Sequence, residues 1–263
     1  MDKKPKMKVA ISAVILTKNE EGNIGRCLDH LCWCGEVIVI DDYSTDNTVR
    51  IAKSRGARVF KRRLNRDFAG QRNFALTKAK NDWVLFLDAD EVVSPSLTSE
   101  IVRRVREDRY DGFYLSRREV FIGQPLKSAD KPIWDWSLGP IKLLRLGKKK
   151  KGQWVGRVHE RWLIKGQVGQ LKTPLLHYSF PDLTTALKKI NFYSSIQANK
   201  LKAKGIKTSW WQIIIYPLGK FLKNFFWHQG WRDGTRGLIF AFLMSFHSYL
   251  VRAKLWSLIR VDK

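Results

Sequence analysis

The stretch Val84–Glu91 reads VLFLDADE, an apolar run that stops in three acids separated by one alanine. Four consecutive apolar residues are typical of an inner strand of a parallel sheet, because both faces of such a strand are covered. Asp88 and Asp90 point the same way if the chain stays extended, and carboxylates so close together repel each other unless a proton or a metal intervenes. The stretch therefore predicts a buried strand that ends in a site for Mg²⁺ or Mn²⁺.

The alternative interpretation of this stretch is a solvated turn, in which Glu91 and Ser94 start the next helix. An isolated Asp-x-Asp motif is usually such a turn. The strand before the motif, and two similar strands earlier in the chain, favour a binding site.

Two earlier segments repeat the pattern of an apolar strand with a polar exit. Val9–Leu16 is followed by the polar segment Thr17–Glu21, and Val37–Ile40 is followed by Asp41-Asp42. Strand and helix patterns alternate along this part of the chain, with helices expected at 23–31, up to about 54, at 70–80 and at 95–106. This alternation predicts an α/β fold whose parallel sheet is covered on both sides.

A nucleotide fits three polar strand ends that meet at one edge of a sheet. Carboxylate and backbone groups at the first two ends can bind the base and ribose, and a metal and a diphosphate can occupy the third. The sequence contains neither a GxGxxG nor a GxxxxGK[ST] loop, which argues against dinucleotide and P-loop enzymes. The diphosphate is therefore expected to be held by the metal and by basic side chains.

The composition points to an anionic partner. Lys and Arg number 49 against 24 Asp and Glu, which gives a formal net charge of +25. Nucleic acid, anionic lipid headgroups and phosphorylated glycans all match such an excess. Of the 11 Trp, nine lie in the second half of the chain beside Lys and Arg, as expected at a membrane interface or a sugar-stacking site.

The cysteines and the N-terminus suggest a cytoplasmic protein. Cys27, Cys32 and Cys34 lie close together without the further cysteines or histidines of a zinc site, so we expect small buried residues in a reducing compartment. The basic segment Met1–Lys8 is not followed by a long apolar run, so no secretory signal peptide is expected.

The C-terminal part has a helical pattern, and we expect a boundary near Pro181 that separates residues 1–181 from 182–263. The apolar segments Trp210–Tyr216 and Gly237–Val251 are broken up by Pro217, Lys220, Lys223, His247 and the flanking arginines. Each therefore falls short of the roughly 20 apolar residues that cross a bilayer. Helices lying in the membrane interface are the favoured interpretation. The alternative is that they pack on the sheet domain or dimerise.

Four segments together resemble the inverting family 2 glycosyltransferases, which have a GT-A fold. In order along the chain they are ILTKNE (15–20), VIDDYSTD (39–46), GQRN (70–73) and LDADE (87–91). This resemblance covers roughly residues 9–100, the expected nucleotide-sugar half, while 101–181 would form the acceptor half. The later segments VHE (158–160), HY (177–178) and GWRDG (230–234) resemble a bacterial subgroup related to lipopolysaccharide core β-1,4-glucosyltransferases.

The resemblance implies a nucleotide-diphospho-sugar donor, commonly UDP-linked, and a Mg²⁺ or Mn²⁺ ion. The donor would be bound by residues from all four segments: Thr17, Asn19, Glu20, Asp41, Asp42, Arg72, Asn73 and Asp88. Asp88 and Asp90 would belong to the metal site, and His177 is a candidate third ligand, although a lone histidine after two leucines is more often structural. The reaction would be a single displacement that inverts the anomeric carbon, with the metal neutralising the leaving diphosphate.

A displacement of this kind needs a general base for the acceptor hydroxyl. Glu160, in a glycine-flanked segment beside His159, is the first candidate, and Glu91 is the second. An ordinary surface glutamate paired with Arg157 or Arg161 is the alternative for Glu160. For the acceptor we expect contacts from Trp134, Asp135, Trp136 and His159, and both Trp154 and Trp162 are expected either to stack on sugars or to pack in the core.

The expected function is thus sugar transfer to a lipopolysaccharide-core or other lipid-linked glycan by a cytoplasmic enzyme held at the inner face of the cell membrane. A nucleotidyltransferase on a similar sheet is one alternative, but Thr17–Glu20 is not the glycine-rich basic loop of those enzymes. A non-enzymatic nucleic-acid-binding protein is the other. The charge alone suggests it, no nucleic-acid module is visible, and we expect no nucleic-acid partner.

Overall fold

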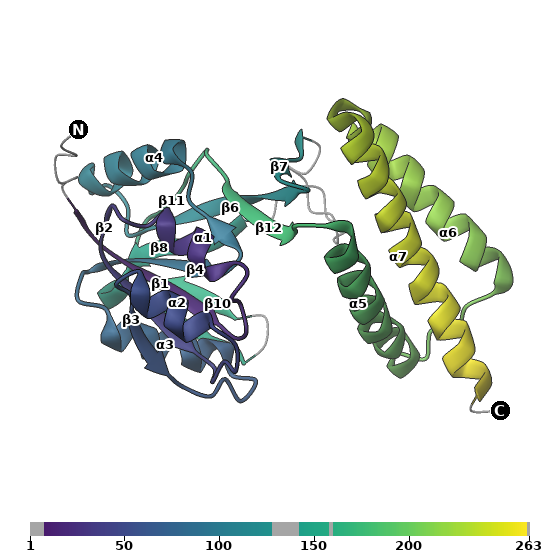
Figure 1. Ribbon diagram of the computed structural model, residues 1–263, viewed down its shortest axis with the longest axis horizontal. Coiled ribbons are helices and arrows are strands. Elements are labelled where there is room, and N and C mark those ends of the chain that lie inside the picture. Colours follow the sequence, from purple (N-terminus) through teal and green to yellow (C-terminus); the bar gives the residue numbers. More distant parts are fainter. Residues whose placement is uncertain (1–7, 128–141, 158–159, 262–263) are drawn as a thin grey trace. The chain divides into compact units, whose positions relative to one another are not determined.

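A computed structural model describes residues 8–127, 142–157 and 160–261. The chain divides into two compact units (Figure 1). The first comprises residues 1–118 and 140–177, and the second comprises 119–139 and 178–263. The division between 177 and 178 lies close to the boundary expected near Pro181, but the second unit also takes residues 119–139 from the middle of the chain.

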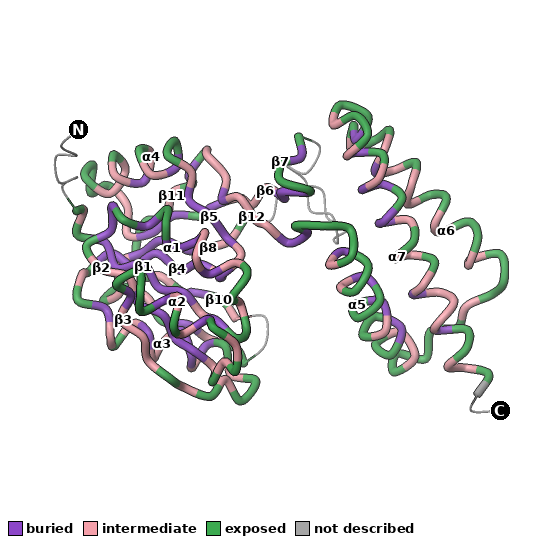
Figure 2. Tube along the Cα trace, viewed as in Figure 1, coloured by how far each residue is buried: buried purple, intermediate pink, exposed green. Residues whose placement is uncertain are grey.

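Four parallel strands form the centre of the first unit. They are β1 (Val9–Thr17), β2 (Cys34–Asp41), β3 (Arg58–Lys61) and β4 (Trp83–Asp88), in the order β3-β2-β1-β4. β4 is buried from Trp83 to Leu87, as expected of a strand covered on both faces (Figure 2). The predicted parallel α/β sheet is confirmed.

Helices and a hairpin cover the two faces of this sheet, each over its own apolar core. One face is covered by α1 (Ile24–Asp29), α2 (Thr48–Ser54) and α4 (Pro95–Arg106). The other is covered by α3 (Phe68–Lys78) and by the antiparallel hairpin of β9 (Gly152–Val155) and β10 (Arg161–Ile164). Side chains of Asp67 and Ser94 cap α3 and α4 by accepting backbone hydrogen bonds.

The hairpin of β9 and β10 places two tryptophans in the apolar core. Trp154 and Trp162 stack with ring centroids 5.3 Å apart, and each meets Phe86 edge-on at 5.1 Å. Both side chains are buried. A Cβ at Gly152 would overlap the Trp162 indole, so the glycine leaves room for this stack. Trp154 and Trp162 therefore pack in the core, which is one of the two roles expected for them, the other being stacking on sugars.

Antiparallel strands extend the sheet beyond β4. They are β8 (Lys142–Lys148), β6 (Gly112–Phe121), β12 (Leu175–Phe180) and β5 (Glu91–Val92). Two short strands also pair with β6: β7 (Gln124–Pro125) is antiparallel to it, and β11 (Val168–Gln170) is parallel to it. A 3₁₀ turn, Lys149–Lys151, links β8 to β9. β4 pairs with β8 as far as Leu85 opposite Leu146, and β5 pairs with β12 through Glu91 and His177. These pairings bring Arg145 and His177 close to the end of β4.

The second unit is mainly helical. It contains α5 (Leu183–Ala203), α6 (Trp210–Leu222), a π-helical turn (Lys223–Trp227), a 3₁₀ turn (Gly230–Asp233) and α7 (Gly234–Val261). Its core joins Phe121, Phe180 and Ile190 to Phe240 and Met244 of α7.

Two details of these helices differ from the sequence interpretation. Pro217 lies inside α6 without ending it, and α7 runs on for 28 residues, although we expected the apolar segment within it to be too short to cross a bilayer. In the described part of the chain, the segment Gly230–Arg260 is the one helix whose length and apolar composition would suffice to cross a bilayer, and a third of its most apolar window is buried within the protein.

Candidate active site

The ends of β1, β2 and β4 meet at one edge of the sheet. In the parallel register Thr17 lies opposite Asp41, and Leu16 lies opposite Asp88. Three segments that are far apart in the sequence therefore present their polar exits side by side, as the strand pattern predicted.

The loops after β1 and β2 are joined by hydrogen bonds. The Asn19 amide donates to Ser44 Oγ at 2.9 Å, and the Asn19 side-chain oxygen accepts from the Thr45 amide at 2.8 Å. The Glu20 amide donates to Thr48 Oγ1 at 2.7 Å. Asn19 itself adopts a left-handed conformation with φ of 53°, which asparagine tolerates better than most residues.

The two aspartates after β2 have different environments. Asp41 is buried and accepts from the Ser44 amide at 3.1 Å. Asp42 accepts from Lys18 Nζ at 2.9 Å and from the Leu64 amide at 3.0 Å. Partial burial acts to raise the pKa of Asp42, but these two bonds outweigh it and hold the pKa below its ordinary value. Asp42 therefore stays ionised at neutral pH.

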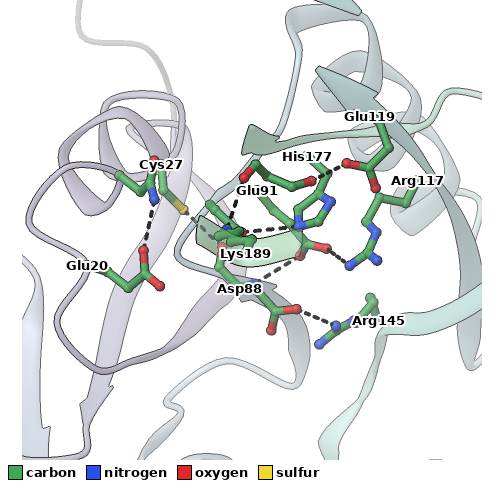
Figure 3. A network of polar contacts seen from close by, with 12 residues as sticks. Glu20, Cys27, Asp88, Glu91, Arg117, Glu119, Arg145, His177 and Lys189 are labelled. Atoms are coloured by element: carbon green, nitrogen blue, oxygen red, sulfur yellow. Dashed lines mark hydrogen bonds and ion pairs between the residues drawn. The ribbon is translucent and has the colours of Figure 1, made fainter. Parts of the chain in front are cut away.

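Asp88, the last residue of β4, forms ion pairs with Arg145 (Figure 3) and with Arg72. Arg145 Nη2 is 2.9 Å from Asp88 Oδ2, and Arg72 Nη2 is 3.4 Å from Asp88 Oδ1. Burial of the carboxyl acts to raise its pKa, but the charges of Arg145 and Arg72, with a smaller effect of Arg117, hold the pKa well below the usual range. The strand end thus carries a permanent negative charge matched by cations.

The two arginines have further hydrogen-bonding capacity. Both side chains are nearly buried, and within the described residues neither Arg72 Nη1 nor Arg145 Nη1 has a hydrogen-bond partner. The same holds for Thr17 Oγ1 at the end of β1. Buried polar groups in proteins normally have partners. Unused donors of two guanidinium groups at this edge fit an anionic ligand such as a diphosphate.

Arg72 also contacts the candidate base. Its Nε donates to Glu160 Oε1 at 3.0 Å, so one guanidinium bridges Glu160 and Asp88 across 72 residues of sequence. The side chain of Glu160 is 16% exposed. The structure thus brings Glu160 to the strand ends, and its partner is Arg72 rather than Arg157 or Arg161.

Glu91 is placed inside the protein. It is fully buried, it accepts from the Asp88 amide at 2.9 Å, and Arg117 Nη1 lies 3.6 Å from its other oxygen. Burial, followed by the negative charge of Asp88, raises the pKa of Glu91. This placement favours a role in holding the turn after β4 over the role of a base that meets an acceptor. Cys27, also buried, contacts the Asp88 carbonyl with its thiol from behind.

Asp90 and His177 form a separate pair. His177 Nε2 lies 3.1 Å from Asp90 Oδ2, and both side chains retain some exposure. Among the described residues, no three His, Cys, Asp or Glu side chains are grouped closely enough to hold a metal by themselves. The predicted trio is therefore not assembled, because Asp88 faces the arginines. The Asp90 carboxylate nevertheless fits a Mg²⁺ or Mn²⁺ site that phosphate oxygens complete, with His177 either orienting it or adding a nitrogen ligand, which suits Mn²⁺ better than Mg²⁺.

The remaining expected residues divide into two groups. Asn73 exchanges two hydrogen bonds with the Trp154 backbone, at 2.8 and 3.0 Å, so its amide ties α3 to β9. Trp134, Asp135, Trp136 and His159 lie outside the described residues.

Sequence reasoning missed Arg145 and Arg117. Each is a charged residue within a strand, and Arg145 is flanked by leucines in LLRLG. A lone arginine in an apolar strand needs a buried partner, and that requirement was the available signal.

Comparison with known proteins agrees with this geometry. Residues 12–164 match the model of glycosyl transferase family 2. An uncharacterised glycosyltransferase of Rickettsia typhi is 32% identical, over 93% of this chain and 86% of its own length. The lipopolysaccharide core biosynthesis glycosyltransferase LpsC of Rhizobium meliloti is 28% identical, over 95% of this chain and 93% of its own length.

Solved structures are more distant. Glucosyl-3-phosphoglycerate synthase from Mycobacterium tuberculosis, in complex with Mn²⁺, UDP and glucosyl-3-phosphoglycerate, is 19% identical with a TM-score of 0.45, covering 76% of this chain and 81% of that chain. TarS of S. aureus is 16% identical with a TM-score of 0.48, covering 94% and 55%. These likenesses are too weak to indicate a donor or a metal. The family match and the relatives carry the conclusion: the chain belongs to glycosyl transferase family 2, as an enzyme with a GT-A fold.

Proposed function

We propose that this enzyme transfers a sugar from a UDP-linked donor, with UDP-glucose as the first candidate, to a hydroxyl of a lipopolysaccharide-core or other lipid-linked glycan, with inversion at the anomeric carbon. The observation that carries the proposal is Arg72, which contacts both Asp88 and Glu160 and keeps an unused donor at the strand ends. The similarity to LpsC over nearly the whole chain supports the acceptor class.

In this proposal the first two strand ends bind the nucleoside. Thr17, whose buried hydroxyl has no hydrogen-bond partner in the part of the chain that the structure describes, and Asp41-Asp42 lie on the same edge as the linked loops of Asn19 and Glu20. Asn73 acts indirectly, because its amide fixes the hairpin next to Arg72. A nucleoside enters between groups that are already oriented, so little rearrangement is needed.

The diphosphate would be bound by chain cations and by the metal site. Arg72 and Arg145 can direct their free Nη1 groups at phosphate oxygens while Asp88 holds both guanidinium groups in place. Asp90 and His177 would hold Mg²⁺ or Mn²⁺, which supplies Lewis-acid stabilisation of the leaving diphosphate. These charges favour departure of the nucleoside diphosphate.

On the acceptor side, Glu160 would accept the proton of the attacking hydroxyl. Its contact with Arg72 orients the carboxylate next to the donor site, and its partial exposure leaves it reachable by a substrate. Trp134, Asp135, Trp136 and His159 are proposed to contact the acceptor glycan. Cytoplasmic location with peripheral attachment to the inner face of the membrane completes the proposal, since a lipid-linked acceptor is presented there.

The test is a donor screen. Purified protein with Mn²⁺ or Mg²⁺ is incubated with a panel of nucleotide sugars, and release of nucleoside diphosphate is measured with and without chelator. We expect UDP release that the chelator abolishes. A nucleotidyltransferase would release no UDP from these donors, and would release pyrophosphate when given a nucleoside triphosphate and a sugar phosphate in a parallel assay. Metal-independent UDP release would remove the metal from the proposal.

A further inference from the structure

Helix α6 differs from an ordinary helix of a water-soluble protein because it is apolar and yet exposed. Every residue of α6 is described, and none of them is buried (Figure 2). Its sequence WWQIIIYPLGKFL contains one charged residue. Isolated exposed hydrophobic residues are normal, but a contiguous apolar surface marks an interaction site.

The inner side of α6 is already occupied by α7. Phe221 contacts Phe242 with ring centroids 4.7 Å apart, Pro217 accepts a hydrogen bond through its carbonyl from Ser245 at 2.8 Å, and Arg252 lies 4.2 Å above the Tyr216 ring. On the opposite side of α6, apolar side chains recur every three or four positions and form one stripe that continues into the π-helical turn. The stripe consists of Trp211, Ile214, Ile215, Leu218, Leu222 and Phe226, each between 46% and 59% exposed.

Exposed tryptophans and bases stand at both ends of this outer stripe. Trp210, at the start of α6, is 72% exposed, and it borders a hollow of about 620 Å³ also lined by Trp256 and Arg260. Trp227, just beyond the stripe, is 71% exposed, and Trp231 next to Arg232 is 56% exposed. Segments that lie in a membrane interface typically have an aliphatic centre flanked by tryptophan and by arginine or lysine.

The charge of the second unit indicates whether the stripe binds a membrane or a second copy of the chain. Residues 183–263 contain 14 Lys and Arg but only two acids, Asp233 and Asp262. Two copies facing each other through α6 would oppose like charges, which disfavours self-association. An anionic lipid surface attracts the same bases, at about 1 kcal/mol for each base near the surface.

α6 is too short to cross a bilayer. Thirteen residues at about 1.5 Å each reach roughly 20 Å, which is less than the hydrocarbon core of about 30 Å. α7 is longer, but it packs against both α5 and α6, and Lys254 Nζ on α7 bonds to Asn191, Ser194 and Ser195 of α5. These polar contacts suit a helix at the centre of a bundle.

We propose that the outer stripe of α6 lies in the interface of an anionic membrane, with its aliphatic side chains among the acyl chains and the flanking bases at the headgroups. The inference rests on the proposed function for its biological sense, since a lipid-linked acceptor lies at that surface. Its physical basis is independent of the reaction.

The experiment is flotation of the full-length protein with vesicles of phosphatidylcholine, with and without phosphatidylglycerol, at low and high salt. We expect wild type to float with the anionic vesicles and to float less at high salt. The double variant I214S/L218S should partition at least about tenfold more weakly, because two aliphatic side chains no longer enter the acyl region. Leu163→Ser, at a position of similar exposure on β10, should float as wild type does.

Trp227→Ala provides a second, independent substitution, and circular dichroism checks that each variant is folded. Equal flotation of folded I214S/L218S and wild type, or no flotation of wild type, would overturn the proposal. So would light scattering that finds wild type dimeric and I214S/L218S monomeric, because the stripe would then be a self-contact. Donor hydrolysis in solution separates the two ideas: normal hydrolysis with lost flotation supports the membrane stripe, while flotation without hydrolysis of any donor removes only the proposed reaction.

Discussion

Arg145 on β8 places its Nη2 atom 2.9 Å from Oδ2 of Asp88 at the end of β4, and this ion pair joins the parallel and antiparallel parts of the sheet. The guanidinium is almost completely buried, and its Nη1 has no partner among the described residues. One nitrogen therefore anchors the group while the other is available to a ligand.

Replacing Arg145 should lower donor binding and turnover strongly while the protein stays folded. Arg145→Ala is expected to lower kcat/KM for the nucleotide sugar at least about a hundredfold, because a positioned cation at the developing diphosphate charge is lost. Arg145→Lys should recover only part of this, since lysine cannot hold Asp88 and a phosphate at once. Steady-state assays of UDP release, with thermal unfolding as control, measure both effects. Unchanged kinetics in a folded Arg145→Ala variant would contradict the diphosphate role.

The Asp90–His177 pair should set the metal requirement. Asp90→Asn or His177→Ala is expected to raise the Mn²⁺ concentration needed for half-maximal UDP release by about 10- to 100-fold or more, because a ligand or its orienting partner is removed. Titration of activity with Mn²⁺ gives the value. His30→Ala, an exposed histidine on the same unit, is the matched control and should leave the titration unchanged.

Glu160 should affect the chemical step rather than donor binding. Glu160→Gln keeps a hydrogen-bond acceptor for Arg72 but cannot take a proton, so we expect kcat for transfer to fall by about 10²- to 10⁴-fold with little change in the Kd for UDP. Rapid-quench assays and calorimetry distinguish the two quantities. Glu107→Gln, on an exposed ion-paired glutamate, should have no effect on either. A variant that transfers sugar normally would remove Glu160 from the reaction.

Glu36 provides a pH test of the fold itself. It accepts hydrogen bonds from Ser12, the Lys80 amide and Arg58. Burial acts to raise the pKa of Glu36, but these three bonds outweigh it and lower the pKa. The stabilisation is therefore present above the unfolded-state pKa of about 4.3 and is lost as pH falls through the lower, folded-state pKa.

The expected measurement follows from that sign. At neutral pH, Glu36→Gln should lower the free energy of unfolding by about 1–3 kcal/mol, because charge-assisted hydrogen bonds are weakened. The difference from wild type should begin to shrink as the pH falls below about 4.3, where the carboxyl of the unfolded protein takes up a proton. It should be lost once the pH has passed the lower, folded-state pKa. Urea unfolding of both proteins between acidic and neutral pH measures it. A difference that grows towards acid would contradict the assigned bonds.

The strands and their polar ends were predictable because local sequence determines them. Val84–Leu87 is apolar on both faces, and the acids follow directly, so the strand and the site edge are read from the same eight residues. Arg145 and Arg117 were not predictable in the same way. They reach the site through antiparallel strands whose register depends on tertiary pairing rather than on local pattern.

Side-chain roles within correctly predicted elements were also decided by packing. Glu91 follows Asp90 in sequence, yet it turns inward to Arg117 and the Asp88 amide. His247 and the flanking arginines were expected to keep the apolar segment Gly237–Val251 too short to cross a bilayer, but the helix that contains it extends over Gly230–Arg260 and stays apolar over enough of its length. The identity of Arg72 as a bridge to Glu160 required the fold, because 88 residues separate the pair.

The hydrogen bonds between the Asn19 loop and the Ser44-Thr45 loop have a thermodynamic consequence for nucleotide recognition. Conformational entropy of these backbones is lost when the protein folds, so it is not lost again when a ligand arrives. Mutating Asn19 would then weaken affinity by loosening the empty protein, even if the asparagine never touches the nucleotide.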